Sequence, residues 1–443
     1  MGLPTLHITA DHVENGIYIG PDVSNYEGNI EIAADLGILK FLGSIKAKGE
    51  ILALSGTGIH AEKNILATSI ESDLTVESGS AITVFKGIKV LGGSIRAVMN
   101  IFSDGYIEAF EDIRANFSII ARSYRQSDEN VNFIKAGGLI ASAMSIQSDG
   151  DVEAANSIVA FDGIDVNGNI KAGVDIIVQW DLNVGGNIEV GRDIAVGRNI
   201  DCKGRIRSRF NTKAGRGIKA ILGIVSGKDI VSGNNIVSDG DIKANGDIQA
   251  VENIHVRHDI KAGKNIKSGK NIEAGFNIEA GGDIEAENNL TAFSNIEVNG
   301  KIKAGGAITV TGYIGDIKSG SYIQAGKFIF AFGDISADGI IRADELIKAG
   351  KSIKAVDDII GSSITTSLGS IVSGGMINCE NIYSANDIEA RTVINASDIV
   401  AIGIVTAGED IRCQNIKAKK IIKEDKIVPT FWPNLWKRIA SKV

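Results

Sequence analysis

The sequence predicts an all-β fold, a single-stranded parallel β-helix with three sides and about 18 residues per coil. First, a six-residue unit of the form Ile-x-small-Gly recurs through most of the chain, as in DIKAGKNIKSGKNIEAGF at 259–276. Second, the composition suits short strands joined by tight turns, with 53 Gly, only 4 Pro and 5% aromatic residues. Third, charges alternate in sign along one side when every third unit is compared.

The repeat fits a strand and does not fit a helix. From Ile134 to Ile314 every sixth residue is Ile, Val or Leu except Thr212, and the residue two places later is small except Asp316. Residues six apart on a helix differ by about 240° and share no face, whereas residues i and i+2 of a strand do. Each unit is therefore one short strand with Ile and the small residue pointing inward, followed by a Gly-containing corner. A single strand cannot bury its inner face, so the units must stack.

The number of sides follows from the outward charges. Every third unit places Lys135, Glu153, Lys171, Glu189 and Arg207 on one side. Stacked about 4.8 Å apart, these residues would form a ladder of opposite charges. Coils with two or four sides would break this order, so we expect three.

The chain divides into four segments by regularity. Residues 1–30 are expected to cap the first coil, and 31–133 to form irregular coils with a polar loop at about 120–133. Residues 134–421 form the regular solenoid, with a register break at 314–317 where three residues are missing from the six-residue step. Residues 422–443 form an amphipathic C-terminal cap or tail.

Bulk properties narrow the class of protein. The net charge of −8 gives no basic field for nucleic acid, and no apolar run reaches the roughly 20 residues of a membrane helix. The N-terminus lacks the features of a secretion signal, so a reduced, cytoplasmic protein is expected. Cys202, Cys379 and Cys413 each follow an inward Ile by two residues, so we expect all three to be buried and unreactive.

No local motif predicts catalysis, and we expect no enzyme, cofactor or metal. His255 and His258 in IHVRHD have a spacing that could suggest a metal site, but the first points outward and the second lies at a corner. Hexapeptide acyltransferases also build triangular coils. Their repeat has the small residue two before the aliphatic one, whereas here it comes two after.

Outward apolar residues are the candidates for an interaction surface. One face carries Val159 and Ile177, with Trp180 at the adjoining corner, and aromatic residues gather near the register break. They could be covered by the chain's own insert or a local bulge, or they could contact another copy or a partner. The aromatic candidates near the break are Tyr313, Tyr322, Phe328, Phe330 and Phe332.

The tail offers a further candidate. Trp432 and Trp436 could share one side of a short helix, either as an end cap or as a segment that binds a partner or a membrane surface.

The segment GDIKANGDI at 240–248 resembles bactofilins and related polymer-forming bacterial β-helix proteins. The resemblance implies a right-handed, three-sided β-helix that polymerises head to head without nucleotide as a cytoskeletal scaffold, and it carries over no catalytic residue. We therefore expect a structural rod that self-associates or docks a partner protein through a flat apolar face. The alternatives are a phage- or toxin-associated β-helical binding rod and, as a second alternative, a hexapeptide-type acyltransferase.

Overall fold

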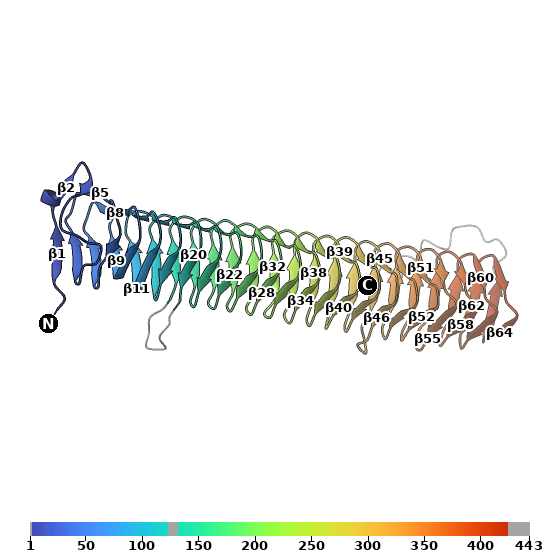
Figure 1. Ribbon diagram of the computed structural model, residues 1–443. Coiled ribbons are helices and arrows are strands. Elements are labelled where there is room, and N and C mark those ends of the chain that lie inside the picture. Colours follow the sequence, from blue (N-terminus) through green and yellow to red (C-terminus); the bar gives the residue numbers. More distant parts are fainter. Residues whose placement is uncertain (1, 123–131, 424–443) are drawn as a thin grey trace. The chain divides into compact units, whose positions relative to one another are not determined.

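The computed structural model describes residues 2–122 and 132–423 and shows a parallel β-solenoid (Figure 1). It has about 21 turns of about 18 residues, which confirms the predicted fold class. Within the described ranges the one helix is a short 3-10 turn, η1 (Ala10–His12). The chain forms two compact units, Met1–Ala250 and Val251–Val443, called unit 1 and unit 2 below.

Unit 1 begins stacking inside the N-terminal segment. Strand β1 (Thr5–Ile8) pairs in parallel with β4 (Asn29–Ile32), while β2 (Val13–Glu14) and β3 (Ile17–Tyr18) form a small antiparallel pair. The next strands are less uniform in length than the later ones: β5 (Gly37–Phe41), β6 (Ile45–Lys46), β7 (Glu50–Ala53), β8 (Thr57–Ala61), β9 (Ile65–Ser72), β10 (Val76–Ser78) and β11 (Ile82–Val90).

The regular strands of unit 1 are short and start at the repeated aliphatic residue. Strand β17 (Ile134–Ala136) pairs in parallel with β20 (Val152–Ala154), which pairs with β23 (Ile170–Ala172), so each strand meets the third strand after it. Three rows of strands result, named here the β17, β18 and β19 faces after β17, β18 (Ile140–Ser142) and β19 (Ile146–Ser148). The predicted charge ladder lies on the β17 face, where Lys171 Nζ is 3.1 Å from Glu153 Oε1.

The β18 face carries the outward apolar residues discussed below. Its strands are stacked in parallel register, so residues with the same place in the repeat form straight rows. The strands are β12 (Ile95–Ala97), β15 (Ile113–Ala115), β18, β21 (Ile158–Ala160), β24 (Ile176–Val178), β27 (Ile194–Val196), β30 (Thr212–Ala214) and β33 (Ile230–Ser232).

The core is built around stacked isoleucines, and the threonine that interrupts one row of them is hydrogen-bonded. Thr212 is fully buried in the aliphatic row, and its hydroxyl lies 2.8 Å from that of Ser208, a buried residue of the small inward slot. A buried hydroxyl that is hydrogen-bonded avoids most of its desolvation cost, which explains why the row tolerates threonine here.

The described residues on both sides of the predicted polar insert stay in register. Ile107 pairs with Ile134 and Ile113 with Ile140, although the insert makes this coil longer than its neighbours. Arg122 and Asn132 flank the gap at the corner between the β19 and β17 faces. The rest of the predicted loop lies outside the described residues.

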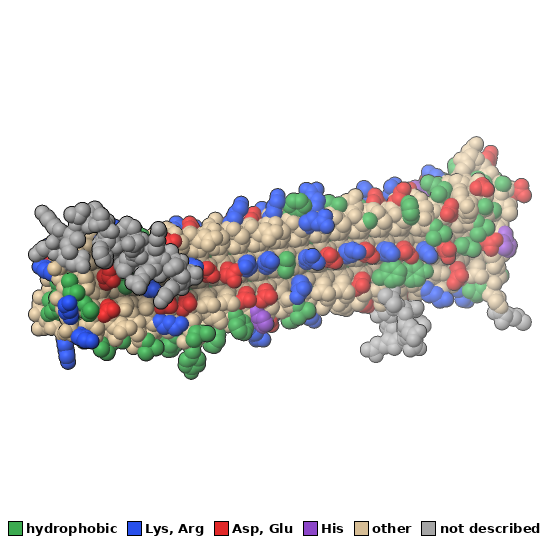
Figure 2. Space-filling model, turned by 180° about the vertical axis from the view of Figure 1, so that it is seen from behind, with side chains coloured by type: hydrophobic (Ala, Val, Ile, Leu, Met, Phe, Trp, Pro, Cys, Tyr) green, Lys and Arg blue, Asp and Glu red, His purple; other side chains and the backbone are tan. Residues whose placement is uncertain are grey.

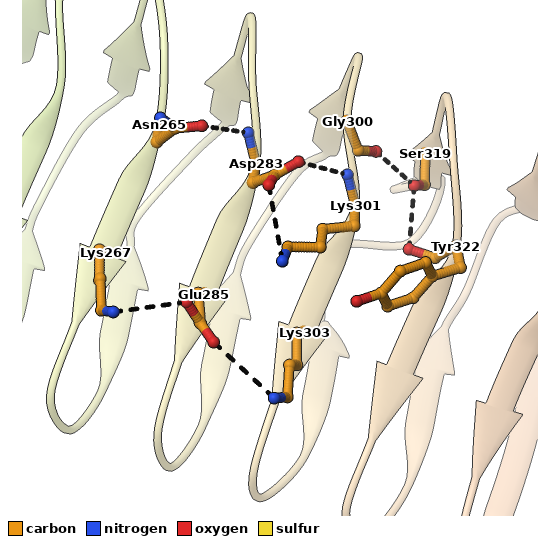
Figure 3. Close-up of polar contacts among 9 residues, drawn as sticks. All are labelled: Asn265, Lys267, Asp283, Glu285, Gly300, Lys301, Lys303, Ser319 and Tyr322. Atoms are coloured by element: carbon orange, nitrogen blue, oxygen red, sulfur yellow. Dashed lines mark hydrogen bonds and ion pairs between the residues drawn. The ribbon is translucent and has the colours of Figure 1, made fainter.

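Unit 2 repeats the same architecture. Its three faces are named after β37 (Ile254–Val256), β38 (Ile260–Ala262) and β39 (Ile266–Ser268). On the β39 face Glu285 lies between two lysines, with its carboxylate oxygens 3.6 Å from Lys267 Nζ and 3.8 Å from Lys303 Nζ (Figure 3). Rows of acidic and basic side chains are also visible on the surface shown in Figure 2.

The corners are held by a second ladder that explains why Asn or Asp precedes many of the repeated Ile residues. The backbone N–H of Asp283 donates to the side-chain oxygen of Asn265 at 2.8 Å, and that of Lys301 donates to Asp283 at 2.9 Å (Figure 3). Each of these side-chain oxygens thus accepts a hydrogen bond from the corner N–H of the next coil. This N–H is not used in the pairing of the strands. Buried or half-buried backbone donors need such partners.

Loss of one member of this corner ladder should destabilise unit 2. Asn271 accepts the N–H of Asn289 at 3.2 Å and donates to Asn253 at 3.0 Å, so Asn271→Ala removes both hydrogen bonds and should cost about 1–3 kcal/mol. Asn271→Asp keeps the acceptor and should cost less than about 1 kcal/mol. Denaturant unfolding of both variants measures the difference, and equal losses would contradict the ladder.

The register break differs from the prediction. Ile296 pairs with Ile317, whereas an unbroken repeat would pair it with Ile314, so this coil is longer than the repeat rather than shorter. The extra length forms the loop after β46 (Ile308–Val310), before β47 (Ile317–Ser319). Ile314, expected to point inward, is 77% exposed in this loop, and Asp316 takes the corner position, where it accepts the N–H of Asp334.

Later coils of unit 2 are shorter but keep three faces. Ile377 pairs with Ile394 and Ile382 with Ile399, in each case one position earlier than the full repeat would give. The mixture of five- and six-residue steps seen in the sequence is therefore absorbed within single coils, and the aliphatic row stays aligned.

Candidate interaction surface

An apolar surface lies on unit 1, where the β18 face meets the β19 face. On the β18 face the outward residues Ala141, Val159, Ile177 and Ala195 form one row, in register across neighbouring strands. Ile177 is 44% exposed and Trp180, at the end of the same coil, is 47% exposed. The structure thus brings together Val159, Ile177 and Trp180, as the sequence suggested.

The surface extends further along the corner than the sequence analysis indicated. Backbone hydrogen bonds stack Phe117 on Met99, Met144 on Phe117, and Trp180 on Asp162. Phe161, beside Asp162, is 56% exposed. We define the apolar surface as Ala141, Val159, Ile177 and Ala195 of the β18 face with Met99, Phe117, Met144, Phe161 and Trp180 of the corner.

Of these corner residues only Trp180 was predicted, because the outward residue of each strand stands out in the repeat and the corner residues do not. The spacing in the sequence could have revealed them. Phe117 follows Met99 by three repeat units, and Met144 follows Phe117 by three units when the residues of the insert are not counted. Solvent-exposed apolar side chains scattered singly are ordinary, whereas a larger apolar patch is the kind of surface on which interaction sites are found.

Two charged side chains flank Trp180 along this corner. Asp162 lies one coil before it and Arg198 one coil after it, as the backbone hydrogen bonds between the three residues show. The Arg198 guanidinium sits over the Trp180 ring, 4.3 Å from its centroid. Within the described residues neither Asp162 nor Arg198 has an ion-pair partner.

Unit 2 has an aromatic corner, defined by Phe276, Phe293, Tyr313 and Phe332 with the adjoining Phe330. The ring centroids of Phe276 and Phe293 are 6.5 Å apart, and those of Phe330 and Phe332 are 4.9 Å apart. Tyr313 is the most exposed member, at 90%. These residues lie on strands of the β37 face or in the corners and loop that follow them, at more than one position of the repeat.

Two of the aromatic residues expected at this cluster lie elsewhere. Tyr322 and Phe328 are half-buried and directly precede β48 (Ile323–Ala325) and β49 (Ile329–Ala331), so each sits at a different corner of the coil. Phe330 does join the aromatic corner, through its contact with Phe332. Trp432 and Trp436 lie outside the described residues.

The histidine pair does not form a shared site. His255 points outward from β37, with Nδ1 3.0 Å from the Glu273 carboxylate, whereas the His258 ring packs edge-on against Phe276 at the corner. No group of three or more His, Cys, Asp or Glu side chains arranged to hold a metal ion is found in residues 2–122 and 132–423. No helix in those same ranges is long and apolar enough to cross a membrane.

Only one of the three cysteines is completely buried as expected. Cys202 fills the inward slot of its strand, and burial raises the pKa of its thiol to about 11. Cys379 and Cys413 are half-buried, because their strands β57 (Ile377–Asn378) and β63 (Asp410–Arg412) end one residue earlier. Burial also raises the pKa of the Cys379 thiol, to about 12.

These environments predict an order of thiol reactivity. Because only the thiolate attacks, Cys202 and Cys379 should react slowly with iodoacetamide in the folded protein, and Cys413 should react first. Mass spectrometry of peptides after timed labelling in mildly alkaline buffer reads out each site. Labelling of Cys202 before Cys413 would place Cys202 outside the core, and labelling after unfolding serves as the control.

Fold and surface together define the class of protein: a three-sided parallel β-solenoid with an exposed apolar surface on one corner. Comparison of the chain with protein-family models, with curated proteins and with solved structures finds no match.

Proposed function

We propose that this protein is a non-catalytic structural scaffold that self-associates laterally through the apolar surface of unit 1. The observation that carries the proposal is an apolar corner, interrupted by Asp162, on a solenoid whose other outward positions are mostly polar or charged. Its exposed members are Met99, Phe117, Met144, Phe161 and Trp180. Burying such a row against a second copy would stabilise an assembly at about 25 cal/mol per Å² of apolar area.

Other features support this role. A solenoid repeats its side chains at a fixed spacing, which suits side-by-side packing of flat faces. The repeat-level resemblance to bactofilins supports the same kind of role, a polymer-forming scaffold that needs no nucleotide. A cytoplasmic location is part of the proposal. The protein's three cysteines, all within the described residues, form no disulfide, which fits a reducing compartment.

The test is the mass of the protein in solution. Wild type should scatter light as a species larger than the 46.6 kDa monomer, and Ile177→Lys with Trp180→Glu should shift it toward the monomer without lowering its melting temperature. The control is Asn183→Lys with Val174→Glu, which introduces the same two charged residues into the same coil but away from the apolar surface. A monomeric wild type would refute lateral assembly.

A further inference from the structure

We infer that two copies of unit 1 pack antiparallel, related by a two-fold axis that passes through the coil of Ile177 and Trp180. The inference rests on the proposed function and adds the orientation, the register and the contacts of the assembly. Four observations on unit 1 lead to it.

The first observation is that charge changes sign on either side of this coil. Residues 136–170 contain five acidic residues and no basic one, whereas residues 192–219 contain nine basic and two acidic residues. No ion pair joins those nine basic side chains to a carboxylate within the described residues. Most of these charges lie on other faces, as Glu153 does on the β17 face, whereas Asp162, Arg198 and Lys213 lie on the β18 face or its corner. Reversing one copy about the Ile177 coil sets the acidic coil of Asp162 beside the basic ones.

The second observation is a specific pair at the corner. Asp162 and Arg198 lie one coil before and one coil after Trp180 and lack ion-pair partners in the described part of the chain. A two-fold axis through the Trp180 coil, perpendicular to the solenoid, brings Asp162 of one copy level with Arg198 of the other. Symmetry generates this contact twice, as an isologous interface requires.

The third observation concerns shape. Phe161 projects from the corner one coil before the axis, and the same corner position one coil after the axis is Gly197. Antiparallel packing therefore sets the Phe161 ring of one copy against a position with no side chain in the other. On the β18 face the same operation pairs Val159 with Ala195 and leaves Ile177 against its own symmetry mate. One coil further out it sets Ala141 opposite Lys213, so the apolar contact is confined to the three central coils.

The fourth observation weighs against the simplest alternative, parallel packing. If two copies packed in parallel through the same face, Lys213 of the β18 face would lie opposite Lys213, and the basic segments 192–219 would lie at one level. Like charges placed opposite one another oppose association. The seven coils from Phe117 to Val231 would bury roughly 600 Å² of the β18 face in each copy, at the low end of stable interfaces. Apolar burial alone is therefore modest, and we expect charge to decide the orientation of the two copies.

The experiment uses charge reversal in the full chain. Asp162→Arg alone and Arg198→Asp alone each place like charges at both symmetric contacts, and each should weaken self-association by about tenfold or more. An equimolar mixture of the two variants should recover association, because the hetero-pair restores opposite charges where each variant alone opposes like ones. The chain carrying both substitutions should recover it as well. Asp201→Arg, on the β19 face, is the matched control and should leave association unchanged.

Sedimentation velocity over a range of concentrations gives the association constants, and thermal unfolding verifies that each variant is folded. If the wild type dimerises but neither the mixture nor the doubly substituted chain associates better than the single variants, the antiparallel register is wrong while lateral assembly stands. If wild type does not associate at all, the proposed function fails and this inference with it. Recovery in the mixture cannot arise from repaired folding, since each chain still carries its own substitution.

Discussion

Ile266→Asp should destabilise unit 2 by about 4 kcal/mol or more, because it removes a packed aliphatic side chain and puts a carboxyl group in its place. Ile266 is fully buried and stacks on Ile284 of the next coil, inside the aliphatic row. The new carboxyl group would either lose its hydration in this interior or force the coil open.

The matched control is the neighbouring residue. Lys267 points outward with a side chain 54% exposed, and Lys267→Asp should change stability by no more than about 1 kcal/mol. Denaturant unfolding followed by circular dichroism compares the two, with hydrogen exchange to locate the opened coils. Similar losses in both variants would mean that the inward and outward assignments are wrong.

Ala292→Phe should have the next largest effect, a loss of about 3 kcal/mol from overpacking. Ala292 is fully buried in the small inward slot of β43 (Leu290–Ala292), directly between Ala274 and Val310 in the stacked row. The three-sided coil closes around this slot, so a phenyl ring can enter only if strands on neighbouring faces move apart.

Ala292→Val is the control, because the next coil already holds Val310 in the same slot, and it should cost less than about 1 kcal/mol. Differential scanning calorimetry on both variants supplies the comparison. If the phenylalanine variant melts with the valine variant, the interior has free volume that the fold described above does not contain.

Most of the fold could be predicted because every repeat unit carries the same pattern of inward and outward residues. The aliphatic residue, the small residue and the corner recur so often that a local error leaves the overall assignment intact. The register break shows the limit. Ile314 continues the six-residue step by coincidence, and only the pairing of Ile296 with Ile317 reveals that the coil has been lengthened.

The interaction surface was harder to predict for a different physical reason. Val159 and Ile177 were visible because each is the outward residue of its strand, in a row across strands that continues into Lys213. Met144 and Phe161 lie at corners, where the backbone turns and side chains project between two faces. Which corner residues form one row depends on the length of each coil, and the insert near residue 123 changes that length.

The corner ladder has a consequence for how such a gene can change in length. Many corners carry an Asn or Asp side chain that accepts the N–H group of whichever coil follows, as Asn169 does for Asn187. Duplication or deletion of one full coil would therefore be accepted at almost any point, with every side chain returned to its own face. Insertion of a single repeat unit would also stack, but it would move all later side chains to the next face and separate the two halves of the apolar surface. Recombination can thus lengthen this protein one whole coil at a time without rebuilding its contacts.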